Sequence, residues 1–158
     1  MKKLGFACIV MFLAATCHGQ DTRTITKASI TFHTTSDDKD GNSQVRDRIT
    51  CNGQDYFQLF CCSSGRKGPD HWDDNSDETR TMDKVSTLKV SDLSACTFVA
   101  GLTAKGNDTW IAIYTLDLTL SDGTRMDYSL GEIWLDSEHS NLTEKSIVLA
   151  RLNPTFPQ

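Results

Sequence analysis

The stretch TWIAIYTLDLTLSDGTRMDYSL, residues 109–130, decides the fold. Residues 109–120 alternate between apolar and mostly polar positions, and this period of two is typical of a strand with one buried face. Asp122 and Gly123 then supply the positive φ that a two-residue hairpin turn needs. Residues 125–130 alternate again, so the stretch predicts a long β-hairpin. The expected buried face carries Trp110, Ala112, Tyr114, Leu116, Leu118 and Leu120.

Shorter segments on both sides of this hairpin also favour strands. Helical periodicity is weak throughout, and residues 63–79 are rich in Gly, Ser and Asp, which predicts a long loop. One residue breaks the pattern, because Asp47 stands at an apolar position of its segment. The sequence therefore predicts an all-β protein, an antiparallel β-sandwich of about seven to eight strands in one domain, residues 20–158. The further strand segments are residues 27–34, 43–51, 56–62, 87–93, 96–102 and 146–152.

The N-terminus has the layout of a secretory leader. Lys2 and Lys3 precede an apolar run over residues 4–15, which is too short to span a bilayer, and small residues follow. We expect cleavage after Gly19, so that residues 1–19 form a signal peptide and the product is secreted and extracellular. Without the two lysines, 14 basic residues face 21 acidic ones, a formal charge of −7. Such an acidic chain is not expected to bind nucleic acid.

Four cysteines lie outside the leader: Cys51, Cys61, Cys62 and Cys96. In an oxidising compartment four thiols favour two disulfides over a metal site. A bridge between the adjacent Cys61 and Cys62 needs an unusual peptide geometry, so each is expected to pair with either Cys51 or Cys96. Which of the two pairs with which stays open. Two sequons, at Asn107 and Asn141, predict glycosylation if the source is a eukaryote.

Two acidic segments are candidates for a cation site. Calcium binds six to eight oxygen ligands in flexible geometry, so two neighbouring loops can share one ion. The alternative is that these residues are simply favoured in solvated turns. If calcium binds, the expected ligands are Asp37, Asp38, Asp40 and Asn42 of the first segment and Asp73, Asp74 and Asp77 of the second.

An aromatic side chain stands within the second acidic segment. Trp72 at a polar loop tip is expected to contact a lipid surface or a sugar, or else to fold back onto the core. Arg66 and Lys67 lie nearby and could meet anionic headgroups. The sequence has no motif of a nucleophile elbow, a zinc protease or a phosphate loop, so we expect no enzymatic activity.

Residues 110–136, WIAIYTLDLTLSDGTRMDYSLGEIWLD, resemble the C-terminal half of PLAT domains. These are the eight-stranded β-sandwiches of lipoxygenases, pancreatic-type lipases and clostridial alpha-toxin, with an architecture similar to C2 domains. The shared features are a Trp that opens a strand, a short turn, and an aromatic, Tyr128, a few residues before Trp134-Leu135. When Gly41 is aligned with the family glycine, Asn42 and Ser43 stand where the family has Thr and its calcium-binding Asp. The role of that Asp therefore does not transfer to this chain.

The resemblance implies a binding module rather than an enzyme. We expect a secreted domain that recognises a membrane surface or a protein partner through one loop end, assisted by calcium. Two alternatives stay open: a soluble protein that recognises a glycan or another extracellular protein through the same loops, and a structural extracellular protein. The sequence gives no indication of the oligomeric state.

Overall fold

The computed structural model describes residues 21–62, 70–104, 108–137 and 142–157. The expected leader, the basic pair Arg66 and Lys67, and both sequon residues, Asn107 and Asn141, lie outside these ranges. Among the described residues, no helix has the length and apolar character needed to cross a bilayer.

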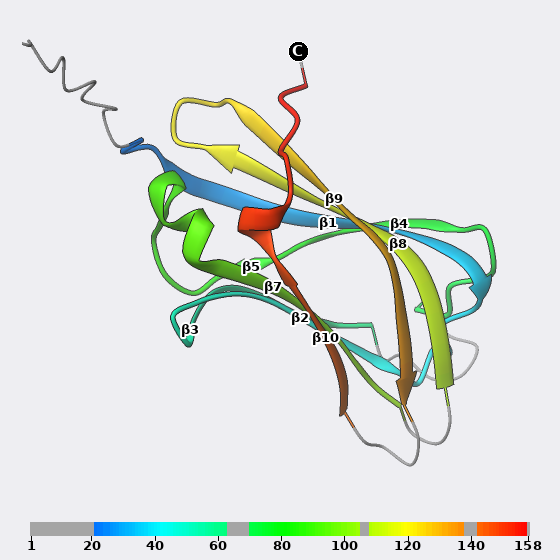
Figure 1. Ribbon diagram of the computed structural model, residues 1–158. Coiled ribbons are helices and arrows are strands. Elements are labelled where there is room, and N and C mark those ends of the chain that lie inside the picture. The colour runs from blue at the N-terminus through cyan, green and yellow to red at the C-terminus, as the bar shows by residue number, and fades with distance from the viewer. Residues whose placement is uncertain (1–20, 63–69, 105–107, 138–141, 158) are drawn as a thin grey trace, which may run out of the picture.

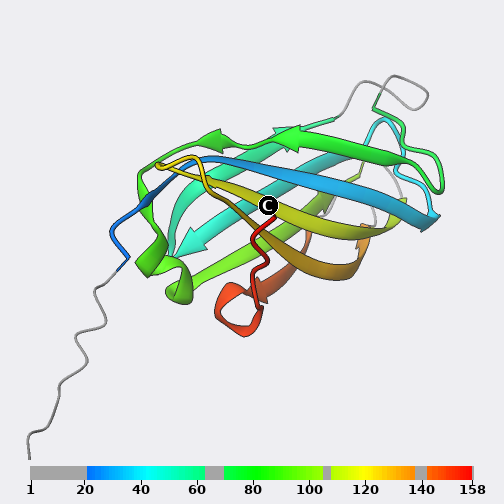
Figure 2. The ribbon, with the colours of Figure 1, turned by 90° about the horizontal axis from the view of Figure 1, so that it is seen from above.

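Two antiparallel sheets of five strands pack face to face, which confirms the expected all-β sandwich (Figure 1). One sheet has the order β4-β1-β8-β9, with β6 also paired to β1, and the other has the order β10-β7-β2-β3-β5. Figure 2 shows the first sheet stacked over the second. The strands are β1 (Thr24–Asp37), β2 (Gln44–Cys51), β3 (Gln54–Cys61), β4 (Asp77–Thr81), β5 (Asp83–Lys84), β6 (Leu88–Lys89), β7 (Cys96–Thr103), β8 (Asp108–Leu120), β9 (Arg125–Ser137) and β10 (Leu142–Val148).

The hairpin of β8 and β9 forms as the sequence predicts. The six apolar side chains of the expected face are all buried between the sheets. The turn is longer than expected, because Leu120 and Thr124 close it with a backbone hydrogen bond of 2.8 Å and only Gly123 has a positive φ, 84°. A three-residue loop whose last residue is left-handed is a common hairpin connection.

Two segments differ from the expected strands. Residues 87–93 contribute only the two-residue strand β6, and the 3-10 helix η1 (Val90–Ala95) follows it. Leu88 and Leu93 both belong to the core cluster, although a strand would place residues five positions apart on opposite faces. The compact turn therefore covers the end of the sandwich with two leucines that an alternating strand could not bury together. The 3-10 helix η2 (Leu149–Arg151) similarly ends the last predicted strand early.

Asp47, the residue that breaks the pattern, lies in the core with 0% of its surface exposed. The backbone N–H of Gly101 donates to its Oδ1 at 3.2 Å. Burial raises the pKa of this carboxyl well above its usual value, because the apolar core disfavours the charged form. Asp47 thus occupies the inward position that the alternation assigned to it.

The disulfides differ from the expected pairing. Cys51 ends β2 directly opposite Cys96 at the start of β7, and these two form one bridge with a Cα–Cα distance of 4.1 Å. Cys61 and Cys62 form the other bridge with each other. The prediction that each would find a distant partner was wrong, because β3 places Cys61, and Cys62 directly after it, at the opposite end of the β2–β3 pair from Cys51. Cys62 adopts the positive φ, 74°, at this site.

Candidate functional site

The two acidic segments meet at one end of the sandwich. The loop after β1 and the loop before β4 form an antiparallel bridge between Lys39 and Trp72, with both backbone hydrogen bonds at 3.1 Å. Thr34 adds two more links, accepting from Asn75 at 2.8 Å and donating to Ser76 at 2.9 Å. The loops lie together beyond the end of β1 (Figure 1). We call this end, residues 36–43 and 70–76, the loop pole.

A cation does lie between the acidic loops, and the chain itself supplies it. The Lys39 side chain is fully buried, and its ammonium donates to the backbone carbonyls of Asp40, Cys62 and Asp70 at 3.1, 2.7 and 2.8 Å. Its Nζ also lies 4.9 Å from the ring centroid of Trp72. The ammonium therefore joins three chain segments around one buried charge.

Burial lowers the pKa of Lys39 to about 8, because an ammonium loses its hydration in the protein interior. Three carboxylates oppose this shift, those of Asp108, Asp70 and Asp40. The cluster of acidic residues thus compensates an internal positive charge. Part of what appears in the sequence as unpaired negative charge has a partner within the chain.

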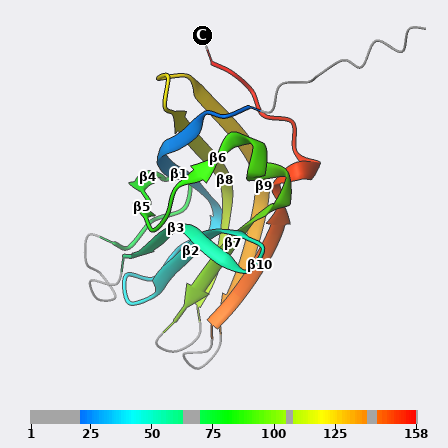
Figure 3. The same cartoon turned by 90° about the vertical axis from the view of Figure 1, so that its left-hand side faces the viewer.

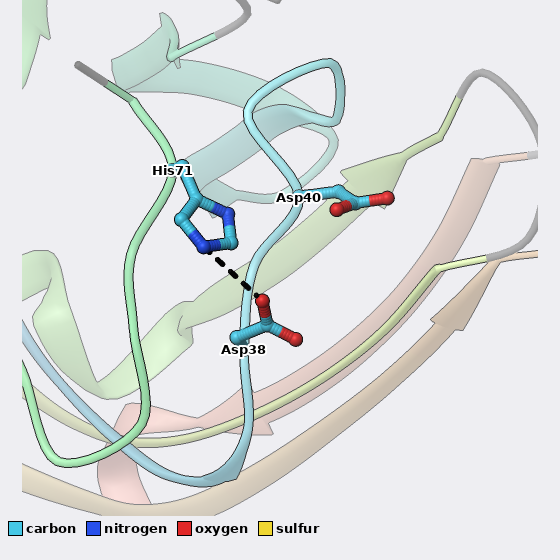
Figure 4. A group of neighbouring side chains, drawn as sticks. All are labelled: Asp38, Asp40 and His71. Carbon is cyan, nitrogen blue, oxygen red and sulfur yellow. Dashed lines mark ion pairs between the residues drawn. The ribbon is translucent and has the colours of Figure 1, made fainter. Parts of the chain in front are cut away.

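The neighbours of Lys39 point to the outside of the pole. Successive side chains of an extended segment alternate in direction, so Asp38 and Asp40 face away from the buried lysine. His71, from the other loop, faces Asp38 (Figure 4). One ligand atom from each of Asp38, Asp40 and His71 lies within 4.8 Å of the other two. The His71 Nε2 is 3.3 Å from Asp38 Oδ2 and 3.1 Å from Asp73 Oδ1.

These three side chains form a donor set that suits a metal other than calcium. Calcium binds oxygen ligands, whereas an imidazole nitrogen together with carboxylates suits zinc and similar transition metals. The structure thus brings together two of the seven expected ligands and adds His71, which the sequence analysis did not select. Its position within the run PDHWDDNSD, between acidic residues, was the signal that could have identified it.

The remaining expected carboxylate ligands do not belong to this group. Asp77 starts β4 and its Oδ1 is 2.7 Å from Nδ1 of His33. The pKa of Asp37 is raised, first by burial and then by the nearby charges of Asp38, Asp74 and Asp136. Asn42 lies in the first loop, and Asp73 and Asp74 lie in the second. The Oδ1 of Asp73 is 3.1 Å from Nε2 of His71, but neither Asp73 nor Asp74 belongs to the three-residue group.

Trp72 is not the exposed aromatic that the sequence suggested. Only 4% of its surface is exposed, and its ring stacks on Phe32 with a centroid distance of 5.1 Å and an interplanar angle of 25°. Trp110 packs against it at 5.2 Å. The expected contact of Trp72 with lipid or sugar is wrong, and the alternative, that the residue folds back onto the core, is correct. The bridge to Lys39 holds its backbone so that the indole points inward.

No family model, no curated protein and no solved structure matches this chain. The resemblance to PLAT domains therefore stays a prediction.

Proposed function

We propose that this protein is a secreted, non-catalytic binding module that holds a divalent metal ion at its loop pole and uses it to bind an anionic membrane surface. The observation that carries the proposal is the convergence of Asp38, Asp40 and His71, whose ligand atoms lie within 4.8 Å of one another. The N-terminal leader pattern and the two disulfides support export to an oxidising compartment.

The packing around Lys39 supports a metal site on the outside of the pole rather than within it. Three inward-facing carbonyls already accept from the ammonium, so a second cation would be repelled there. The same bridge fixes the backbone that carries Asp38 and His71. Three protein ligands would leave a tetrahedral ion with one free position, and a phosphate oxygen of a lipid headgroup can take it.

The overall charge explains why an ion is needed. The chain carries a formal charge of −5 with its leader, and the loop pole is rich in carboxylates, so a bare anionic surface would repel it. A bound divalent ion would neutralise the two carboxylate charges of Asp38 and Asp40 and would offer a lipid phosphate a direct metal–oxygen bond. Because Trp72 is buried, this mechanism relies on charge and coordination and not on insertion of an indole.

Isothermal titration tests the metal site. We expect zinc to bind at least tenfold more tightly than calcium, and His71→Ala to weaken zinc binding at least tenfold. The matched control is His33→Ala, which removes another histidine beside a carboxylate, that of Asp77, outside the three-residue group. No heat from either ion at about 1 mM would end the proposal, and calcium binding that survives His71→Ala would restore the oxygen-only site expected from the sequence.

Sedimentation with phosphatidylserine vesicles tests the partner. With zinc present we expect the wild type to move to the pellet and His71→Ala to stay in the supernatant. Equal recovery in the supernatant with and without the ion would remove the membrane as the target.

A further inference from the structure

A second surface with the features of a ligand site lies away from the loop pole, where the edges of the two sheets come together. β9 ends one sheet and β10 begins the order of the other, and they lie side by side (Figure 3). Between them is an open groove of about 380 Å³, at the lower end of the size range of small-molecule sites. Its apolar lining consists of Leu130, Ile133 and Ile147.

Trp134 stands at this groove and is the most exposed large apolar side chain of the described residues, at 59%. It lies on β9 directly opposite Ile111 of β8, whose own side chain is only 6% exposed. Neither residue belongs to the core cluster, whereas their chain neighbours Leu135 and Trp110 are fully buried within it. An exposed indole on a regular strand has a rigid support, unlike one on a loop tip.

The orientation of the Trp134 ring is fixed by its own strand. Its indole Nε1–H donates to Oε1 of Glu132 at 2.7 Å. The polar edge of the ring is thereby satisfied, so what remains for a ligand is the apolar ring face. Glu132 keeps a second carboxylate oxygen that can accept hydrogen bonds.

The polar members of the groove complete an amphipathic lining. Glu132 offers an acceptor, Lys145 of β10 offers donors, and Ser146 offers both. Saccharides match this combination, because one face of a pyranose ring presents C–H groups that stack on an aromatic ring while its rim presents hydroxyl groups. An anionic polysaccharide fits less well, since it would meet Glu132 and a chain with a formal charge of −5.

We propose that the groove between β9 and β10 is a binding site for an uncharged saccharide, with a pyranose ring stacked on Trp134 and its hydroxyls paired with Glu132 and Lys145. The site shares no residue with the metal donor set and needs no ion. It goes beyond the membrane-binding function proposed above and does not depend on it.

The test uses the full exported chain with neutral hexasaccharides of glucose and of N-acetylglucosamine, both β-linked and α-linked, by titration calorimetry and tryptophan fluorescence. We expect binding by the wild type, a loss of at least tenfold in affinity for Trp134→Ala, and a partial loss for Glu132→Gln. Trp134→Phe keeps an aromatic face and should retain more affinity than Trp134→Ala. The matched control is Phe60→Ala, which removes another half-exposed aromatic, one that lies on β3 away from the groove.

Three results would overturn the proposal. The first is the absence of binding to all of these saccharides at millimolar concentration, and the second is binding that Trp134→Ala leaves unchanged. The third is a change of oligomeric state in Trp134→Ala on size-exclusion chromatography, which would assign the surface to self-association. Binding that persists in EDTA and in His71→Ala is expected and separates this site from the metal-dependent function.

Discussion

Trp72 and Trp134 show opposite outcomes for the same residue type. Trp72 belongs to an acidic, polar loop, yet it is buried against Phe32 and Trp110. Trp134 belongs to a regular strand, yet more than half of its surface is exposed. The difference shows that the local polarity of a segment does not decide whether an aromatic is available to a ligand. What decides it is whether another segment covers the aromatic. The loop that carries Lys39 pairs with Trp72 and holds it against the core, whereas Trp134 lies on the edge strand β9.

The largest expected effect separates the two tryptophans by stability. Trp72→Ala removes a large buried ring and its stacking, so we expect it to lower the free energy of unfolding by about 3–5 kcal/mol. Trp134→Ala removes an exposed ring and should change the same quantity by no more than about 0.5 kcal/mol. Urea unfolding followed by circular dichroism measures both, and equal losses would contradict the contrast.

A smaller effect tests what holds Trp72 inward. Lys39→Met keeps a long side chain but removes the ammonium that donates to three backbone carbonyls, of which that of Asp40 keeps the Ser43 N–H at 2.9 Å. An unpaired buried polar group costs about 1–3 kcal/mol, and relief from burying a charge offsets part of this, so we expect a net loss of about 2 kcal/mol. Hydrogen exchange at the amides of Lys39 and Trp72 should accelerate.

Lys27→Met is the control for that substitution. Lys27 lies on the same strand as Phe32 but is exposed, so its replacement should leave the free energy of unfolding and these amides unchanged. Protection of the Lys39 amide that survives Lys39→Met would show that the backbone bridge suffices without the ammonium.

The pKa of Lys39 gives the same contact a pH dependence. Its folded value of about 8 lies below the ordinary 10.5, so between these values the unfolded chain binds more protons than the folded one. The stability of the wild type should therefore rise, by about 1–2 kcal/mol, as the pH increases from 7 to 9.5. The rise should be absent in Lys39→Met, and parallel pH profiles of the two proteins would contradict the assignment.

The smallest effect is optical. Acrylamide should quench mainly the emission of Trp134, because Trp72 and Trp110 are buried. Trp134→Phe should remove most of the quenchable signal while leaving thermal unfolding unchanged. Strong quenching that persists in this variant would show that the loop pole opens and exposes Trp72.

The fold was predictable where the signal is local. The alternation on β8 and the Asp-Gly turn identify a hairpin within some twenty residues, and one buried face follows from them. The inward position of Asp47 was also predictable, because this residue occupies an apolar position in the alternation of residues 43–51. The pairing of Cys51 with Cys96 could not be predicted from the sequence, because it depends on the register between β2 and β7, which are far apart in the chain.

The candidate sites were less predictable, since each rests on contacts between distant segments. Lysine is seldom fully buried, and nothing near Lys39 in the sequence indicates that the carbonyls of Cys62 and Asp70 will surround it. Asp38 and Asp40 were identified from charge alone, whereas His71 becomes a partner only through the bridge that aligns the two loops. The groove at Trp134 exists only because the edges of two sheets meet.

The pairing of Asp127 with Thr155 has a practical consequence. Each donates its backbone N–H to the other's carbonyl at 2.9 Å, so the final residues act as a short cover for the outer edge of β9. An affinity tag fused after Gln158 would disturb the pairing of Thr155 with β9. Removal of Thr155 and the residues after it would expose the backbone N–H and C=O of Asp127, to which a second molecule could add a strand. Handles for purification or immobilisation therefore belong at the start of the exported domain, after the expected cleavage site at Gly19.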